Sequence, residues 1–266
     1  MKIVETYVRF FLCLALALTL AACGSNKGER KTADRSPVEE KLDLQKRVSY
    51  RMQLAVEYYQ QGQSKVALEE IRQVLLIAPD TSDAYSLRAL IAMDANDNQP
   101  AEEDFLRAIK LAPANSDLVN NYGWFLCQTG REKLALTYFE RVLKDPNYPT
   151  PSKVLNNAGV CSLRMKDLKT AEAYFMRGFK EQPGNPSINA NLAKVYFDRG
   201  EHEKARFYIQ RVVKADILTA DVLWLAIKIE NKLGDETAVS SLGTQLRRRH
   251  PNSKEFTDFQ RGAFNE

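Results

Sequence analysis

The cysteines are the side chains of this 266-residue chain whose chemistry is easiest to foresee. Cys13 and Cys23 lie in or next to an apolar N-terminal segment, whereas Cys127 and Cys161 lie in the body of the chain. A cysteine sulfur can carry a lipid, and two cysteines that meet in an oxidising compartment can form a disulfide. Cys23 is therefore a candidate for lipidation, and the two later cysteines are candidates for a cross-link.

The N-terminal segment predicts export with a lipid on Cys23. Residues 10–20 are apolar but for one threonine, and this run is too short to span the roughly 30 Å of a bilayer core. It has the length of the apolar region of a signal peptide. The following Leu20–Cys23 segment (LAAC) resembles the bacterial lipobox, where a peptidase cuts before a diacylated cysteine. An ordinary secretory signal with an incidental cysteine is the alternative.

On this interpretation residues 1–22 are a lipoprotein signal peptide, and residues 23–47 are a lipidated N-terminus with a polar, flexible tether. Two or three acyl chains make such an anchor effectively permanent. Bacterial lipoproteins with aspartate after the cysteine tend to stay in the inner membrane, and here that residue is Gly24. The resemblance therefore implies attachment to the outer membrane, on its periplasmic face.

Residue patterns for catalysis or metal binding are missing from the sequence. The two histidines, His202 and His250, have no metal-ligating residue three or four positions further on. No glycine-rich phosphate loop occurs. We therefore expect no catalytic residue, no metal site and no cofactor, and an enzyme is the weakest functional alternative.

The charge of the chain gives no reason to expect nucleic acid as a partner. The net charge of +4 comes from 38 basic and 34 acidic residues that are spread along the sequence. The one dense basic cluster, Arg247 to His250, is predicted at the end of a helix, where cations complement the helix dipole.

The body of the chain repeats about every 34 residues, which is the spacing between Pro79 and Pro113. Small residues recur at the eighth position of the unit: Ala55, Ala89, Gly123, Gly159 and Ala193. Alanine recurs at the twentieth: Ala67, Ala101, Ala135, Ala171 and Ala205. Large residues follow four positions later: Ile71, Phe105, Phe139, Phe175 and Ile209. Glycines mark a turn between two helices: Gly62, Gly130, Gly200 and Gly234. A small residue lets two helices cross closely, and the large one fills the space beside it.

This pattern resembles the tetratricopeptide repeat. The resemblance implies an all-α fold, a right-handed superhelical solenoid of about six tetratricopeptide repeats with a C-terminal capping helix. The predicted units are residues 48–81, 82–115, 116–149, 152–185, 186–219 and 220–253. The sixth is degenerate, with Ile227 at the small position and Val239 at the alanine position, as terminal repeats often are. Residues 254–266 are predicted as a capping helix and tail, with Phe256 and Phe259 on its buried face.

A solenoid places the first helices of the third and fourth units side by side, and these helices carry Cys127 and Cys161. In an oxidising periplasm the two cysteines are expected to form a disulfide. The alternative is a pair of buried free thiols that act as small apolar side chains.

In this fold the first helices line a concave groove, where we expect a protein partner to bind. The predicted groove residues are Tyr59, Met93, Asn120, Asn121, Trp124, Asn156, Asn157, Arg164, Asn191, Lys194, Phe197 and Trp224. Asparagine recurs at the sixth position of units three to five, where it can hold the backbone of a ligand. The alternative is that it bonds within its own helix turn. Trp124 can anchor a partner or pack between helices.

Longer segments permit a finer comparison. They are Asn120–Leu126 running into Gly130-Arg131, the loop at Tyr148-Pro149, Val154–Gly159, and Gln245–Ser253. Together with the lipobox, tether and six units, they resemble the PilW/PilF lipoproteins of type IV pilus biogenesis. This resemblance implies a pilotin-like scaffold that assists localisation, multimerisation or stability of the pilus secretin in the outer membrane. No residue role is transferred to Trp124 or to the two body cysteines.

The expected partners are thus the pilus secretin, by resemblance, and the membrane through the lipid anchor, and we expect the chain to be a monomer. The main alternative is a tetratricopeptide-repeat scaffold for another envelope machine, such as outer-membrane protein insertion or cell-wall synthesis.

Overall fold

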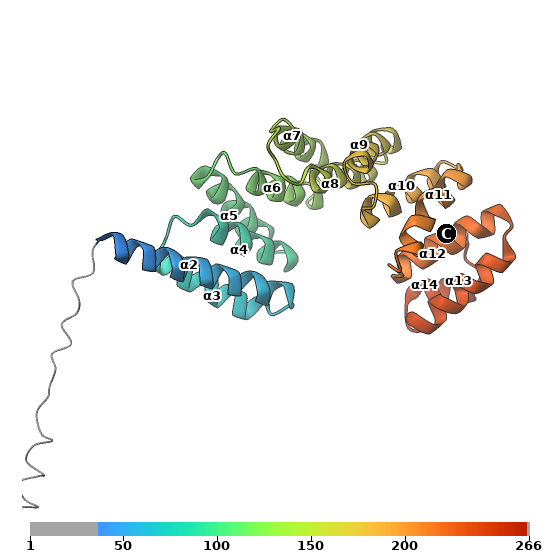
Figure 1. The fold of residues 1–266 in the computed structure, drawn as a ribbon, viewed down its shortest axis with the longest axis horizontal. Helices are drawn as coiled ribbons and strands as arrows, with labels where there is room; N and C mark the ends of the chain where they lie inside the picture. The colour runs from blue at the N-terminus through green and yellow to red at the C-terminus, as the bar shows by residue number, and fades with distance from the viewer. Residues whose placement is uncertain (1–36, 265–266) are drawn as a thin grey trace, which may run out of the picture. The chain divides into compact units, whose positions relative to one another are not determined.

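The computed structural model describes residues 37–264, and within them every regular element is an α-helix (Figure 1). The chain divides into two compact units at residues 50 and 51. The helices are α2 (Pro37–Gln60), α3 (Ser64–Ile77), α4 (Ser82–Asp94), α5 (Asn98–Leu111), α6 (Ser116–Gln128), α7 (Glu132–Leu143), α8 (Pro151–Arg164), α9 (Leu168–Glu181), α10 (Pro186–Asp198), α11 (His202–Lys214), α12 (Ala220–Leu233), α13 (Glu236–Arg249) and α14 (Lys254–Gln260). The predicted all-α repeat fold is confirmed.

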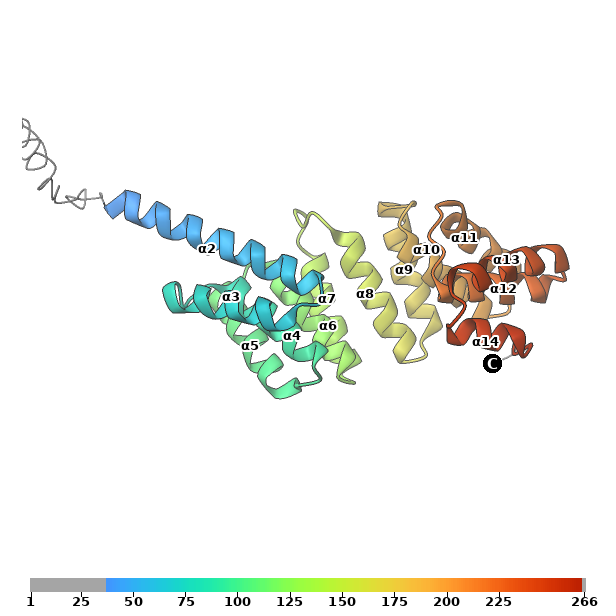
Figure 2. The ribbon, with the colours of Figure 1, turned by 90° about the horizontal axis from the view of Figure 1, so that it is seen from below.

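Helices of residues 51–266 pack in consecutive pairs. The helices α4, α6, α10 and α12 begin at the first residues of the predicted units 82–115, 116–149, 186–219 and 220–253, and α8 begins one residue before its unit. From α4 to α12 the backbone of each first helix also contacts the first helix of the next unit (Figure 2), whereas in the described chain second helices meet through side chains, as Arg177 of α9 does with Glu140 of α7. The first helices therefore form one continuous layer.

The start of the structure differs from the predicted tether. Residues 37–47 were expected to belong to a flexible segment, but they are the first half of α2. Pro37 stands at the start of the helix and Glu39 and Glu40 lie in its first turn, where a fixed φ and negative charge both favour a helix N-terminus. The prediction considered the polarity of this segment and missed these start signals.

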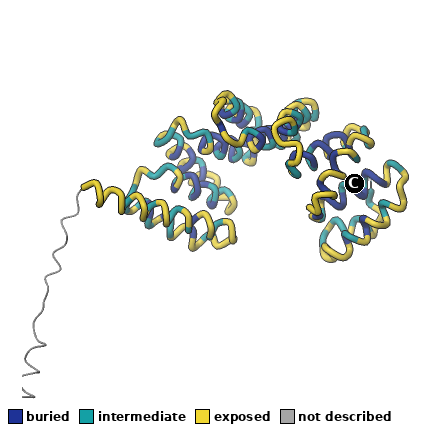
Figure 3. The backbone as a smooth tube through the Cα atoms, viewed as in Figure 1, coloured by how far each residue is buried: buried dark blue, intermediate teal, exposed yellow. Residues whose placement is uncertain are grey.

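In the third and fourth units the repeated small and large residues meet inside the helix pair, as the sequence pattern predicts. A β-carbon added to Gly123 would lie 2.8 Å from the Phe139 ring, and one added to Gly159 would lie 2.3 Å from the Phe175 ring. Both rings are fully buried, so that they occupy the space which a side chain at the glycine would need. Buried residues accordingly follow the surfaces between helices (Figure 3).

The sixth unit uses the same packing with the sizes exchanged. Ile227, at the small position, is fully buried, and Gly243 stands where other units carry a large residue. A β-carbon on Gly243 would lie 2.3 Å from the ring of Phe259 on α14. The capping helix therefore supplies the bulk that α13 lacks, which explains why this unit departs from the repeat pattern.

The turn between the two helices of a unit requires a left-handed backbone. Gly62, Gly130, Gly200 and Gly234 have φ values of 73–79°. In the second and fourth units the same position is occupied by Asn96 (φ 61°) and Lys166 (φ 60°). Asparagine tolerates this conformation, but lysine pays a steric cost between its β-carbon and the backbone.

Replacing Lys166 with glycine is therefore expected to stabilise the protein. The Lys166→Gly variant should gain about 1 kcal/mol in the free energy of unfolding, because it removes left-handed strain. The measurement is the midpoint of urea unfolding. Gly200→Ala is the matched control, since nothing lies within 4 Å of an added β-carbon there and only backbone strain is introduced. It should lose about as much stability, and equal midpoints for all three proteins would contradict the explanation.

Candidate functional site

The layer of first helices contains an apolar hollow near its N-terminal end, called here the N-terminal hollow. Its cavity volume is about 510 Å³. The lining comes from one face of each of three consecutive first helices: Met52, Gln53, Val56, Glu57, Asp83, Ser86, Leu87, Leu90, Asp117, Leu118 and Asn121. The apolar members can cover an apolar side chain of a partner, and the acidic ones stand among them as polar contacts.

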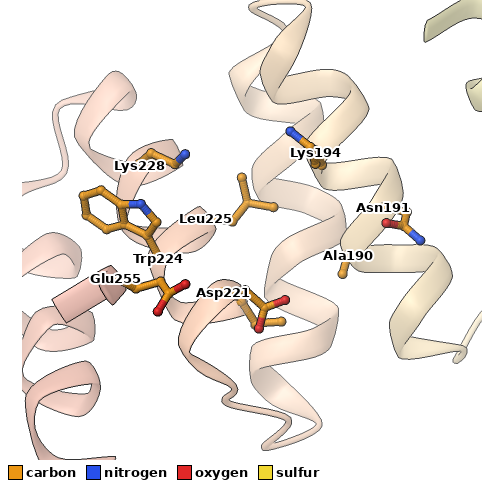
Figure 4. Close-up of a pocket in the computed structure, with 9 residues that line it drawn as sticks. Ala190, Asn191, Lys194, Asp221, Trp224, Leu225, Lys228 and Glu255 are labelled. Carbon is orange, nitrogen blue, oxygen red and sulfur yellow. The ribbon is translucent and has the colours of Figure 1, made fainter. Parts of the chain in front are cut away.

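A smaller hollow, called here the C-terminal pocket, lies between α10, α12 and α14 (Figure 4). It is lined by Ala190, Asn191, Lys194, Asp221, Val222, Trp224, Leu225, Lys228 and Glu255, and its cavity volume is about 230 Å³. Trp224 is only 8% exposed and packs against Phe264 with ring centroids 5.7 Å apart. The indole therefore forms a fixed wall of the pocket.

Two lysines, Lys194 and Lys228, carry positive charge on one side of the C-terminal pocket. Lys194 forms an ion pair with Asp198 at 3.0 Å. The ammonium group of Lys228 lies over the rings of Phe197 and Trp224, at 5.4 and 5.6 Å from their centroids. Burial and, after it, the nearby Lys194 lower the pKa of Lys228. The pocket thus holds a half-buried cation whose charged form is poorly solvated.

Asparagines link neighbouring units along the layer of first helices. Asn157 Nδ2 donates to Asn120 Oδ1 at 3.1 Å, and Asn191 Nδ2 donates to Asn156 Oδ1 at 3.0 Å. Between the third and second units, Asn121 Nδ2 donates to Ser86 Oγ at 3.2 Å. In each case the sixth position of one unit bonds to the fifth position of the preceding unit. These amides therefore form a ladder between units, in place of the bonds within one helix turn that the sequence left open as the alternative.

This ladder changes the role of one predicted groove residue. Asn120 is 1% exposed, so its side chain cannot be reached by a partner. It supports the groove from behind by accepting the bond from Asn157. Asn121, Asn156, Asn157 and Asn191 remain partly exposed beside it.

The other predicted groove residues occupy mixed environments. Trp124 and Met93 are partly buried and pack against the core, so Trp124 is only partly accessible to a partner. Tyr59 Oη donates to Asp94 Oδ2 at 2.7 Å, and burial, followed by this bond, raises the pKa of the Tyr59 phenol. Arg164 is exposed and donates weakly to Glu132 Oε1 at 3.5 Å.

Cys127 and Cys161 lie on α6 and α8 and are joined as a disulfide pair, with their Cα atoms 5.7 Å apart. This separation is within the range of disulfides. Both residues are fully buried. The cross-link connects the units that Asn157 and Asn120 also connect. The predicted lipid site Cys23 lies outside the described residues.

Two polar residues of the C-terminal pocket were missed from the sequence. Asp221 occupies the second position of its unit, as Asp83 and Asp117 do in theirs, and this recurrence was the available signal. Glu255 belongs to α14, which the sequence predicts only as a capping helix over the core. Its place in the pocket depends on how that helix docks.

No group of three or more histidine, cysteine, aspartate or glutamate side chains in the described chain is arranged to hold a metal ion. Among residues 37–264 no helix combines the length and apolar character needed to cross a bilayer.

Comparison with known proteins identifies the repeats. One tetratricopeptide-repeat profile matches residues 52–116 and 87–150, and a second matches residues 162–218. In sequence the chain is 28% identical over 253 residues to the type IV pilus assembly protein PilF of Pseudomonas aeruginosa, covering 95% of this chain and 98% of that protein.

Two solved structures of pilus proteins are also similar to this chain. The crystal structure of PilW, described as a widely conserved type IV pilus biogenesis factor, is similar with a TM-score of 0.73 and 32% identity, over 80% of this chain and 98% of that one. The structure of Pseudomonas aeruginosa PilF is similar with a TM-score of 0.72 and 28% identity, over 83% of this chain and 99% of that one.

The disulfide between α6 and α8 is expected to carry measurable stability. Reduction, or the double variant Cys127→Ala/Cys161→Ala, should lower the free energy of unfolding by roughly 3–4 kcal/mol, because the cross-link restricts the unfolded chain. Urea unfolding measures the loss, and thiol titration of the unfolded, unreduced protein should find neither cysteine free. Free thiols at Cys127 and Cys161 would show that the pair is reduced.

Proposed function

The chain belongs to the PilW/PilF family of tetratricopeptide-repeat proteins of type IV pilus biogenesis, and we propose that it is a lipid-anchored scaffold for the pilus secretin. In this proposal Cys23 carries the lipid, and the protein works at the periplasmic face of the outer membrane. The groove of the first helices binds a segment of the secretin and so assists its localisation, multimerisation or stability. The protein acts by binding and without catalysis.

The observation that carries the proposal is the similarity to PilF over 95% of this chain and 98% of that protein. A shared repeat alone would be limited to the helical body. Here the match extends through nearly all of both chains, which favours a shared architecture and a shared task. The export signal and the lipobox-like LAAC segment before the body supply the independent support for an envelope location.

The N-terminal hollow supports the choice of a protein ligand. Apolar side chains at its surface, among them Val56 and Leu90, are flanked by polar groups such as Asn121. An apolar centre with a polar rim is the usual composition of a surface that binds another protein. A repeat scaffold for a different envelope machine would present the same kind of surface. Such a scaffold is therefore the second candidate function.

Deletion of the gene tests the assignment to the pilus. Without the protein, heat-stable secretin multimers and surface pili should both be reduced, as measured by immunoblotting and electron microscopy. Normal multimers together with normal pili would remove the secretin as the client and leave the second candidate.

Two valine variants test the N-terminal hollow. Val56 lies in it and is 37% exposed, whereas Val66 on α3 lies outside it and is 40% exposed. Because the two valines are almost equally exposed, glutamate should affect folding similarly at both. Val56→Glu should weaken co-purification of the secretin roughly tenfold, since a charge is placed on the apolar contact. Val66→Glu should retain it, and equal retention by both variants would move the interface elsewhere.

The anchor is tested by Cys23→Ala. The variant should leave the membrane fraction for the soluble periplasmic fraction, because the protein has lost the acyl chains that hold it. Cys127→Ala/Cys161→Ala, which leaves Cys23 in place, is the control and should stay with the membrane. Membrane retention of Cys23→Ala would contradict lipidation at this residue.

A further inference from the structure

The C-terminal pocket contains a cation that no carboxylate pairs with directly. Lys228 forms no ion pair within residues 37–264, although Asp198 and Asp258 attract its charge from a greater distance, and its ammonium group lies over the rings of Phe197 and Trp224. Lys194 is held by Asp198, yet its ammonium group points across the pocket toward that of Lys228 (Figure 4). Lys194 is exposed and Lys228 is half-buried, and two ammonium groups that face each other attract an anion placed between them.

The opposite end of the pocket has the opposite charge. Asp221 and Glu255 lie there, away from the two lysines (Figure 4), and neither forms an ion pair in the described chain. On the α10 wall, Asn191 uses its Nδ2 group in the ladder, so its Oδ1 atom remains as an acceptor. The acidic end suits donors, such as backbone N–H groups or a basic side chain.

The walls between these ends are apolar. Trp224 provides a flat and nearly buried surface, and Ala190, Val222 and Leu225 complete the lining. A cavity of about 230 Å³ has room for one side chain and a short stretch of backbone. A helix about 10 Å across would not enter it.

We propose that the C-terminal pocket binds an acidic residue of an extended partner segment. The carboxylate lies between Lys194 and Lys228, the methylene groups lie on Trp224, and backbone N–H groups face Asp221 and Glu255. This inference rests on the proposed function, because it names the chemistry of a segment that the scaffold recognises. The two charged ends also fix the register of the segment in the pocket.

A peptide fits this pocket better than a phospholipid headgroup does. Asp221 and Glu255 would repel the several negative charges of an anionic membrane surface or a phosphate group. A single carboxylate on a neutral backbone avoids that repulsion. Its aliphatic stem also makes use of the indole surface, as an amphipathic side chain does.

The test uses the full mature chain and two synthetic peptides, acetyl-Ala-Leu-Glu-Leu-Ala-amide and its counterpart with glutamine. Nitrogen-15 NMR follows the two indole N–H signals. The glutamate peptide should shift the signal of Trp224 and leave that of Trp124, and it should bind roughly tenfold more tightly than the glutamine peptide. Equal affinity for both peptides, or no shift with either, would overturn the proposal.

Variants assign the effect to the lysines. Lys228→Met keeps the length of the side chain that covers Trp224, and Lys194→Gln changes an exposed residue that the core does not need. Each should weaken binding of the glutamate peptide roughly tenfold. Lys214→Met, an exposed lysine on α11, is the matched control and should bind as the unchanged protein does. Unchanged binding by both pocket variants would overturn the assignment.

Glycerol 3-phosphate tests whether the pocket binds a phospholipid headgroup in place of a peptide. A Trp224 shift with this compound and none with the peptides would replace the peptide by a lipid headgroup. The outcome of these binding experiments is independent of the gene deletion, because the deletion measures secretin multimers and pili in the cell. A pocket that fails to bind the peptide therefore removes this inference without removing the proposed function.

Discussion

The close contact between a small residue on the first helix and a large ring on the second is the constraint on which the structure depends. Gly159 beside Phe175 shows it most clearly, because the ring occupies the place of a β-carbon. This contact sets the distance between paired helices, and so it sets which faces remain for the next unit. In the sixth unit, Gly243 and Phe259 keep the contact with α14 as the source of the ring.

The groove depends on how successive first helices are held together. The bond from Asn157 to Asn120 and the disulfide between Cys127 and Cys161 both join α6 to α8. A partner that lies across several units binds to residues on different helices, and it gains affinity when those helices are already fixed relative to one another. The amide ladder and the cross-link therefore fix these helices relative to one another, even where, as at Asn120, the side chain is buried.

Sequence patterns located the candidate surface but could not assign each residue to it. The groove positions of one helix follow from its period, so Trp224 and Lys194 were found. Whether an asparagine bonds within its helix or to a neighbour depends on the rotation of the next unit, which no local pattern contains. The same limit applies to Glu255, whose helix has no counterpart in the repeat.

The sequence by itself determined the helical pairs, their order and the small-to-large contacts, because these interactions lie within one 34-residue period and repeat along the chain. Only the tertiary structure decided the ladder between units, the burial of Asn120 and the convergence of Lys194 and Lys228 on one pocket. Those features depend on the angle between neighbouring units, which is a sum of many side-chain contacts and is specified by no single residue.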